Sequence, residues 1–235
     1  MTALLLFDID GTLLRGATAA HAAALHQALR RVHGIDPSSE RGLVDPGGRT
    51  DGEIARIILL GAGISADRID ARADRVREEC CRIYASQAGE DLSHTVLPGV
   101  RELLTALAAR EDIRLALVTG NFEAIARLKL RQAGISSFFT GGPGGFGSDS
   151  EDRAVLPGIA RRRAGIGGVP WPRSDTIVIG DTPRDIACAR ADGLRCIAVA
   201  TGPFAADTLD GADWLARDAA QVGALLREQV LGPGT

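Results

Sequence analysis

Short apolar runs recur along the chain and alternate with stretches of helical periodicity. Continuous apolar runs of this length are typical of strands buried on both faces of a sheet. They lie at Ala3–Phe7, Ile113–Val118, Thr176–Ile179 and Cys196–Ala200, with a weaker fifth candidate at Ala212–Leu215. Helical patterns lie at Val100–Arg110, Ala124–Ala133, Arg153–Ala164, Asp185–Ala191 and Ala219–Val230. The alternation predicts an α/β protein whose parallel sheet has helices on both faces.

One long interval interrupts this alternation. Between about Arg15 and Thr95 no buried strand is evident, and helices are predicted near Ala19–His33, Gly52–Leu60 and Ala66–Gln87. An all-helical insertion after the first strand explains the interval, and Pro98-Gly99 marks the return to the sheet. We therefore expect a core domain of residues 1–14 and 96–235 and a helical cap domain of residues 15–95. The glycine-rich stretch Gly141–Gly147 is predicted to be a loop.

Composition narrows the class of protein. The 235 residues carry a formal net charge of -3, so no basic field favours nucleic acid, and any phosphate must be held by a few local groups. No apolar run approaches the ~20 residues of a membrane helix. The four cysteines form no C-x-x-C pair and are expected as reduced thiols, which favours a cytoplasmic protein. Lys129 is the only lysine, and we assign no function to the preference for arginine among the basic residues.

Two carboxylates follow the first predicted strand, in Asp8-Ile9-Asp10-Gly11-Thr12. In an open parallel sheet, ligands bind beyond the carboxyl ends of the strands. Asp8 could attack phosphorus there and form an acyl phosphate. Asp10 could protonate the leaving oxygen and later activate water, if neighbouring carboxylates raise its pKa. Taken alone, the motif also fits a polar turn between a strand and a loop.

A second acidic pair enters a predicted helix, in Gly180-Asp181-Thr182-Pro183-Arg184-Asp185. With Asp8, the carboxylates of Asp181 and Asp185 could form an oxygen-rich site suited to Mg²⁺. The alternative is helix capping by Asp181 or Thr182, with Asp185 favoured by the helix dipole. Capping and metal binding can coexist.

Three further segments could bind phosphate. Thr119 offers a hydroxyl, and Gly120 and Asn121 offer backbone N–H groups near a helix start, although an ordinary N-cap turn fits as well. Arg153 is the preferred balancing cation because it opens a helix after the glycine-rich loop. Lys129 is another candidate, whereas Arg161–Arg163 are expected on a solvated face. Arg49, in Gly48-Arg49-Thr50-Asp51, could close over an anionic group of a substrate or could be a surface arginine.

Together these motifs resemble the haloacid dehalogenase superfamily of phosphatases and phosphomutases, in particular its phosphoglycolate phosphatase-like members with a helical cap. The resemblance covers essentially the whole chain. It implies a Rossmann-like core, Asp8 as nucleophile, Asp10 as acid/base and Thr119 as a phosphate ligand. It also implies Mg²⁺ held by Asp8, Asp181, Asp185 and the backbone carbonyl of Asp10.

The same resemblance limits the type of reaction that is expected. Dehalogenase members lack the second aspartate of the first motif, so Asp10 favours phosphoryl transfer. Phosphonatase members use a cap lysine, and no lysine lies between Arg15 and Thr95. The family commonly has a lysine in its third motif, for which Arg153 is the substitute here.

The sequence thus predicts a Mg²⁺-dependent phosphatase that acts on a small phosphorylated metabolite, phosphoglycolate-like or a sugar phosphate, through phospho-Asp8. The alternatives are a phosphomutase of the β-phosphoglucomutase type and a non-catalytic protein that binds a phosphorylated ligand. The expected partner is the metabolite alone, with no nucleic acid or membrane, and the protein is expected to be a monomer or homodimer.

Overall fold

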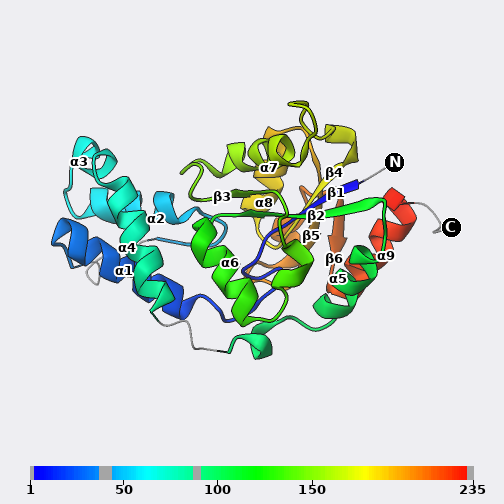
Figure 1. Ribbon diagram of the computed structural model, residues 1–235, viewed down its shortest axis with the longest axis horizontal. Helices are drawn as coiled ribbons and strands as arrows, with labels where there is room; N and C mark the ends of the chain where they lie inside the picture. Colours follow the sequence, from blue (N-terminus) through cyan, green and yellow to red (C-terminus); the bar gives the residue numbers. More distant parts are fainter. Residues whose placement is uncertain (1–2, 37–43, 87–90, 232–235) are drawn as a thin grey trace.

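A computed structural model describes residues 3–36, 44–86 and 91–231. Its six parallel strands form one sheet in the order β3-β2-β1-β4-β5-β6 (Figure 1). The strands are β1 (Ala3–Phe7), β2 (Ile113–Thr119), β3 (Gly144–Phe146), β4 (Thr176–Gly180), β5 (Arg195–Val199) and β6 (Trp214–Ala216). The four main apolar runs form strands as predicted, and the weaker fifth candidate overlaps β6. The predicted parallel α/β architecture is confirmed.

Helices cover both faces of the sheet because successive strand residues point to opposite sides. In β1, Leu5 and Phe7 join the hydrophobic core on one face, whereas Leu4 and Leu6 join the core on the other. The first face is covered by α5 (Val100–Ala108), α6 (Glu123–Gln132) and α9 (Ala219–Leu226), which continues as a π-helical segment at Arg227–Leu231. The second is covered by α7 (Leu156–Ala164) and α8 (Pro183–Ala191). Short 3₁₀ segments occur at Ser93–Thr95, Ser136–Phe139, Arg153–Val155, Arg173–Asp175 and Ala206–Leu209.

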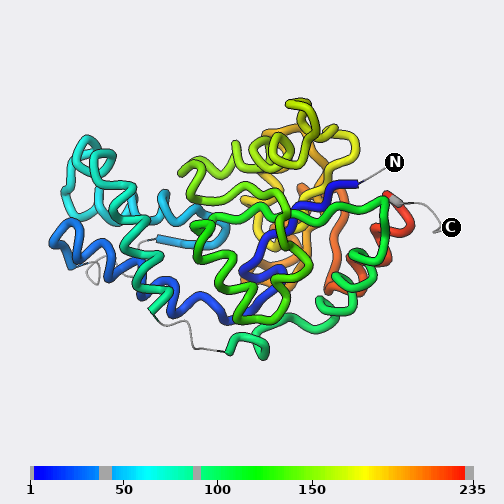
Figure 2. Tube along the Cα trace, in the orientation of Figure 1, coloured from blue at the N-terminus to red at the C-terminus, as the bar shows by residue number. Residues whose placement is uncertain are grey.

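The four helices of the insertion lie to one side of the sheet and have a hydrophobic core of their own (Figure 2). They are α1 (Ala19–His33), α2 (Asp51–Gly61), α3 (Ala66–Asp70) and α4 (Ala73–Ala85). The expected helical insertion after the first strand is therefore present. The predicted cap domain also includes residues 37–43 and 87–90, which lie outside the described residues.

The predicted single helix over Ala66–Gln87 is wrong, because the chain turns between α3 and α4. At the turn, Arg72 Nη1 donates to the carbonyl oxygen of Val32 at 2.8 Å, and Arg68 reaches that of His33 at 3.3 Å. Contacts with the end of α1 therefore stabilise a break that periodicity does not reveal. Gln87 itself lies outside the described residues.

The predicted loop at Gly141–Gly147 is also wrong in part, since it contains β3 at the edge of the sheet. A Cβ atom on Gly145 would lie 2.2 Å from the carbonyl oxygen of Leu156, at the start of α7. Glycine is needed there because helix and strand backbones approach closely. A strand made of glycines shows no apolar pattern.

Two expectations from composition can be compared with the structure. All four cysteines are free, as predicted. The helices of the described residues include none that is both long and apolar enough to cross a membrane.

Leu5→Ala tests the core beneath the site. Leu5 is fully buried in the middle of β1, so its truncation should lower the free energy of unfolding by about 3 kcal/mol. Leu60→Ala, at a position that is 49% exposed in α2, should change it by less than about 0.5 kcal/mol. Urea unfolding followed by circular dichroism measures both. Equal midpoints for the two variants would contradict the packing described for β1.

Candidate active site

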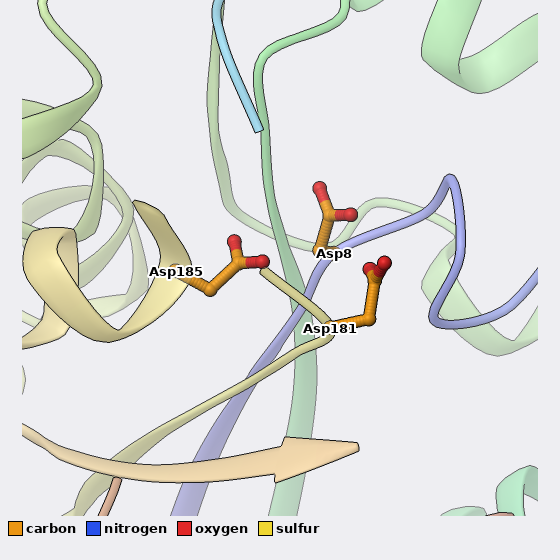
Figure 3. Close-up of side chains that lie close together, drawn as sticks. All are labelled: Asp8, Asp181 and Asp185. Carbon is orange, nitrogen blue, oxygen red and sulfur yellow. The ribbon is translucent and has the colours of Figure 1, made fainter. Parts of the chain in front are cut away.

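Three neighbouring strands end at one edge of the sheet and bring distant polar residues together. Asp8 follows β1, Thr119 ends β2 and Asp181 follows β4. Figure 3 shows Asp8, Asp181 and Asp185 side by side, with Asp185 on the first turn of α8. All three are buried, and one carboxylate oxygen of each lies within 4.8 Å of those of the other two. Asp8, Asp10 and Asp181 line one cavity.

The acidic cluster holds more negative charge than its surroundings neutralise. Burial, together with the charge of Asp185, raises the pKa of Asp8 from 3.8 to about 7, although Arg153 opposes the shift. Burial and the neighbouring carboxylates raise the pKa of Asp181 to about 8. These shifts mark a place where a further positive charge would be stabilising.

The oxygen atoms of the cluster fit a divalent cation. Asp181 Oδ1 accepts a hydrogen bond from Thr12 at 2.8 Å, whereas its buried Oδ2 has no partner within residues 3–36, 44–86 and 91–231. A Cβ atom on Gly202 would lie 1.7 Å from that Oδ2, so only glycine leaves the oxygen its space. A buried carboxylate oxygen with no donor suits a hard ion that binds oxygen ligands.

Asp185 serves both the helix and the cluster. Its Oδ2 accepts from the backbone N–H of Thr182 at 3.0 Å, and its own N–H donates to Thr182 Oγ1 at 3.2 Å, which forms a capping box at the start of α8. Its Oδ1 accepts from Arg153. Thr182, rather than Asp181, is therefore the N-cap, and capping coexists with a place in the acidic cluster.

Arg153 reaches the acidic cluster, as the sequence predicted for the balancing cation. It opens the 3₁₀ turn before α7, where Asp152 caps the turn through the N–H of Ala154. Its Nη2 donates to Asp8 Oδ1 at 3.0 Å and also to Asp185. Among the residues that the structure describes, its buried Nε has no hydrogen-bond partner.

Asp10 lies in the same cavity, but its carboxylate faces a different cation. Lys129 Nζ lies 2.7 and 2.9 Å from the two carboxylate oxygens, and Asn121 Nδ2 donates to Oδ2 at 2.9 Å. The Asp10 side chain is not part of the acidic cluster. Burial alone would raise the pKa of Asp10, but the charge and hydrogen bonds of Lys129 hold it below 3.8. The expectation of a raised pKa for Asp10 is therefore wrong.

Lys129, the second candidate for the balancing cation, does lie at the site, but its pairing with Asp10 was not predicted. It is fully buried on α6 and also donates to Asn121 Oδ1 at 2.8 Å. Two signals were present in the sequence. Lys129 is the only lysine of the chain, and it lies on the buried face of α6 with Ile125 and Ala126, four and three residues earlier.

The segment after β2 is held by its own side chains and by the insertion. Thr119 Oγ1 accepts from Asn121 Nδ2 at 2.9 Å and from the Asn121 N–H at 3.3 Å. A Cβ atom on Gly120 would lie 2.0 Å from the carbonyl oxygen of Arg49. Glycine is therefore required at position 120 for the insertion to approach the sheet.

Hydrogen bonds of Thr50 and Asp51 hold the insertion against the edge of the sheet where Asp8 and Asp181 lie. Thr50 Oγ1 donates to the carbonyl oxygen of Glu151 at 2.7 Å. Asp51 accepts from the N–H of Phe122 at 2.6 Å, and its own N–H donates to the Gly120 carbonyl at 2.9 Å. The same Asp51 carboxylate lies 3.0 Å from His21 Nε2. Sequence reasoning had given neither His21 nor Asp51 a place at the site.

A cavity of about 810 Å³ lies between the insertion and the sheet edge. Thr119, Gly120, Asn121, Arg153 and Arg49 line it, so all the predicted phosphate-binding residues border the same space. Arg49 is engaged within the insertion, where its Nε donates to the Asp45 carbonyl at 3.0 Å and its Nη1 pairs with Glu53.

Arg161 departs from the solvated face expected for Arg161–Arg163. It is 6% exposed and pairs with Asp192, its Nε lying 2.7 Å from a carboxylate oxygen. Arg162 and Arg163 are exposed as expected.

Comparisons with known proteins agree with this architecture. The family model for haloacid dehalogenase-like hydrolases matches residues 5–190, and a HAD-hydrolase-like model matches residues 157–224. The chain therefore belongs to the haloacid dehalogenase-like hydrolase family. A phosphoglycolate phosphatase from Chromobacterium violaceum is 30% identical over 228 residues, covering 94% of this chain and 95% of the relative. One from Rhodospirillum rubrum is 29% identical over 209 residues, covering 86% and 81%.

Solved structures share the fold at low identity. CbbY from Rhodobacter sphaeroides in complex with phosphate has a TM-score of 0.65 at 21% identity, covering 95% of this chain and 97% of that one. A β-phosphoglucomutase from Clostridium difficile has a TM-score of 0.65 at 20% identity, covering 94% and 93%.

Lys129→Met tests the buried pair with Asp10. The substitution leaves a largely buried carboxylate without its cation, so the free energy of unfolding should fall by about 2 kcal/mol. Arg131→Met changes an exposed position on the same helix and should shift it by less than about 0.5 kcal/mol. Urea unfolding measures both. If Lys129→Met unfolds at the midpoint of Arg131→Met, the pair does not stabilise the folded protein.

Stability without metal should fall as pH rises. Asp8 and Asp181 have folded-state pKa values of about 7 and 8, above the ordinary 3.8, so the folded protein retains protons that the unfolded chain releases. The stabilisation that these two carboxyl groups give the folded protein is complete below about pH 4 and is lost as pH rises through about 7 to 8. A bound cation replaces these protons, so Mg²⁺ should raise the melting temperature more at about pH 8.5 than at about pH 5.5.

Thermal unfolding in excess chelator and in Mg²⁺ measures the difference. Asp181→Asn removes one titrating group and should reduce the effect of pH on the Mg²⁺-induced shift. A shift of equal size at both pH values in the unaltered protein would contradict a site formed by these acids.

Proposed function

We propose that this hydrolase is a Mg²⁺-dependent phosphatase that acts on small phosphorylated metabolites through a phospho-Asp8 intermediate. The acidic cluster of Asp8, Asp181 and Asp185 is the observation that carries the proposal, because it places a carboxylate that could attack phosphorus beside a candidate cation site. Residues 15–95 are proposed to act as the cap that covers it. The phosphoglycolate phosphatases among the relatives make phosphoglycolate-like esters and sugar phosphates the first substrates to consider.

The metal would be held by Asp8 and Asp181, with Asp185 beside them and the backbone carbonyl of Asp10 as a further ligand. Asp181 Oδ2, buried without a partner, supports this assignment. When bound, the ion supplies positive charge that offsets repulsion between the nucleophile and the phosphoryl oxygens. The free N–H of Arg153 and the Thr119 hydroxyl would donate to those oxygens, with the Gly120 and Asn121 backbone N–H groups near them.

In the first step, an Asp8 carboxylate oxygen attacks phosphorus, the ester P–O bond breaks, and the leaving oxygen takes a proton from Asp10. In the second, water attacks the phosphorus of phospho-Asp8 while Asp10 takes the proton of that water, and inorganic phosphate leaves. The pairing with Lys129 favours the ionised form of Asp10, which suits the second step directly. For the first step Asp10 must carry a proton, which the pairing with Lys129 disfavours.

Asp8→Asn tests the nucleophile. Hydrolysis of 4-nitrophenyl phosphate should fall by at least about a thousandfold, because an amide cannot form the acyl phosphate. Asp210→Asn changes an exposed acid outside the site and should leave the rate unchanged. Excess chelator should abolish activity in the unaltered protein and Mg²⁺ should restore it. Release of inorganic phosphate, measured directly, distinguishes hydrolysis from transfer to a second hydroxyl. Full activity of Asp8→Asn, or equal activity in chelator, would exclude this mechanism.

A further inference from the structure

We propose that the substrate is a monophosphate ester of an uncharged, largely apolar alcohol, larger than glycolate. This inference rests on the proposed phosphatase function and narrows its substrate. It follows from the lining of the 810 Å³ cavity and from the partners of its arginines.

The side of the cavity away from the acidic cluster is mostly apolar. Leucine, isoleucine, valine and alanine side chains line it, mainly from the insertion. They include Leu14, Ala22, Leu25, Val44, Ile54 and Ile58. Cavities of about 300 to 1,000 Å³ suit ligands well beyond a two-carbon acid. Apolar walls stabilise a leaving group in proportion to the apolar area that it buries.

Of the three arginines that the described residues place at the cavity, two pair with acids, and the third, the exposed Arg15, donates to a backbone carbonyl. Among the lining residues that the structure describes, the arginines are Arg15, Arg49 and Arg153. Arg15 donates to the Thr201 carbonyl at 2.7 Å, and Arg153 bridges Asp8 and Asp185. Arg49, the residue placed to meet a second anion, pairs with Glu53 and with the Asp45 carbonyl.

The charges on the insertion side therefore do not favour a second anion. The carboxylates of Asp45 and Asp51 line the same region as Arg49. A substrate carboxylate would have to displace Glu53 from Arg49, while Asp45 keeps its own pairing with Arg184 and Asp51 its contact with His21. An alkyl group at the same place loses no hydrogen bonds and excludes water from apolar walls.

A homologous series of n-alkyl monophosphates, from ethyl to octyl, tests the proposal in the presence of Mg²⁺. The leaving alcohols have nearly equal pKa values, so differences in kcat/KM report contacts with the alkyl chain. We expect kcat/KM to rise about two- to fourfold per methylene until the cavity is filled. A carboxylate at the end of a chain of equal length should lower it by about tenfold or more.

Two pairs of variants test which residues cause these differences in kcat/KM. Ile54→Ser should flatten the alkyl series, whereas Ile57→Ser, on the same helix but outside the cavity lining, should keep it. Glu53→Gln frees Arg49 and should raise kcat/KM for the carboxyalkyl phosphates by about fivefold without improving the alkyl esters. Glu78→Gln, an exposed acid on α4, is its matched control and should change neither.

The outcomes separate the two proposals. Hydrolysis of 4-nitrophenyl phosphate together with a flat alkyl series, or with a preference for phosphoglycolate over butyl phosphate, overturns the substrate inference alone. No phosphate release from any of these esters overturns the phosphatase function and the inference with it.

Discussion

Repulsion among buried carboxylates is the constraint on which the structure of this site depends. Parallel strands end at one edge, and β1 and β4 deliver Asp8 and Asp181 to neighbouring places there. Arg153 contacts Asp8 and Asp185, but burial still raises the pKa values of Asp8 and Asp181. A fold that buries these acids together would be stabilised by a cation, so the proposed metal site and the integrity of the sheet edge depend on the same few oxygen atoms.

The insertion completes the site through backbone contacts as much as through side chains. The segment Gly48-Arg49-Thr50-Asp51 lies against the ends of β2 and β4, and a Cβ atom on Gly48 would lie 2.4 Å from the Thr182 hydroxyl oxygen. Gly120 allows the matching approach from the sheet side. Thr50 and Asp51 then bond to backbone groups near Glu151 and Phe122. These contacts hold the apolar side chains of the insertion across the cavity from Asp8.

The sequence was sufficient to predict the features that depend on pattern and on strand ends. Continuous apolar runs located β1, β2, β4 and β5, and the structure brings the acids that follow β1 and β4 together at one edge. β3 could not be predicted, because Gly144 and Gly145 are selected by close packing rather than by hydrophobicity. The break between α3 and α4 depends on contacts with α1. Lys129 and Asp10 are 119 positions apart, and a helical face alone does not reveal that a buried lysine has a carboxylate partner.

The two aspartates of the first motif differ by the cations they face. Asp8 shares Arg153 with Asp185 and lies beside Asp181, so burial and like charges raise its pKa. Asp10 accepts a hydrogen bond from Asn121 and pairs with Lys129, which contacts no other acid among the described residues of the site. The pKa of Asp10 is therefore lowered despite burial. Without a cation these shifts run opposite to the proposed roles, because a nucleophile must be ionised and a general acid protonated; a cation at the acidic cluster would lower the pKa of Asp8 and restore its ionised form. Asp8 and Asp10 are two residues apart, but their pKa values depend on Arg153, just before α7, and on Lys129 in α6. Neither cation belongs to the Asp8–Thr12 motif.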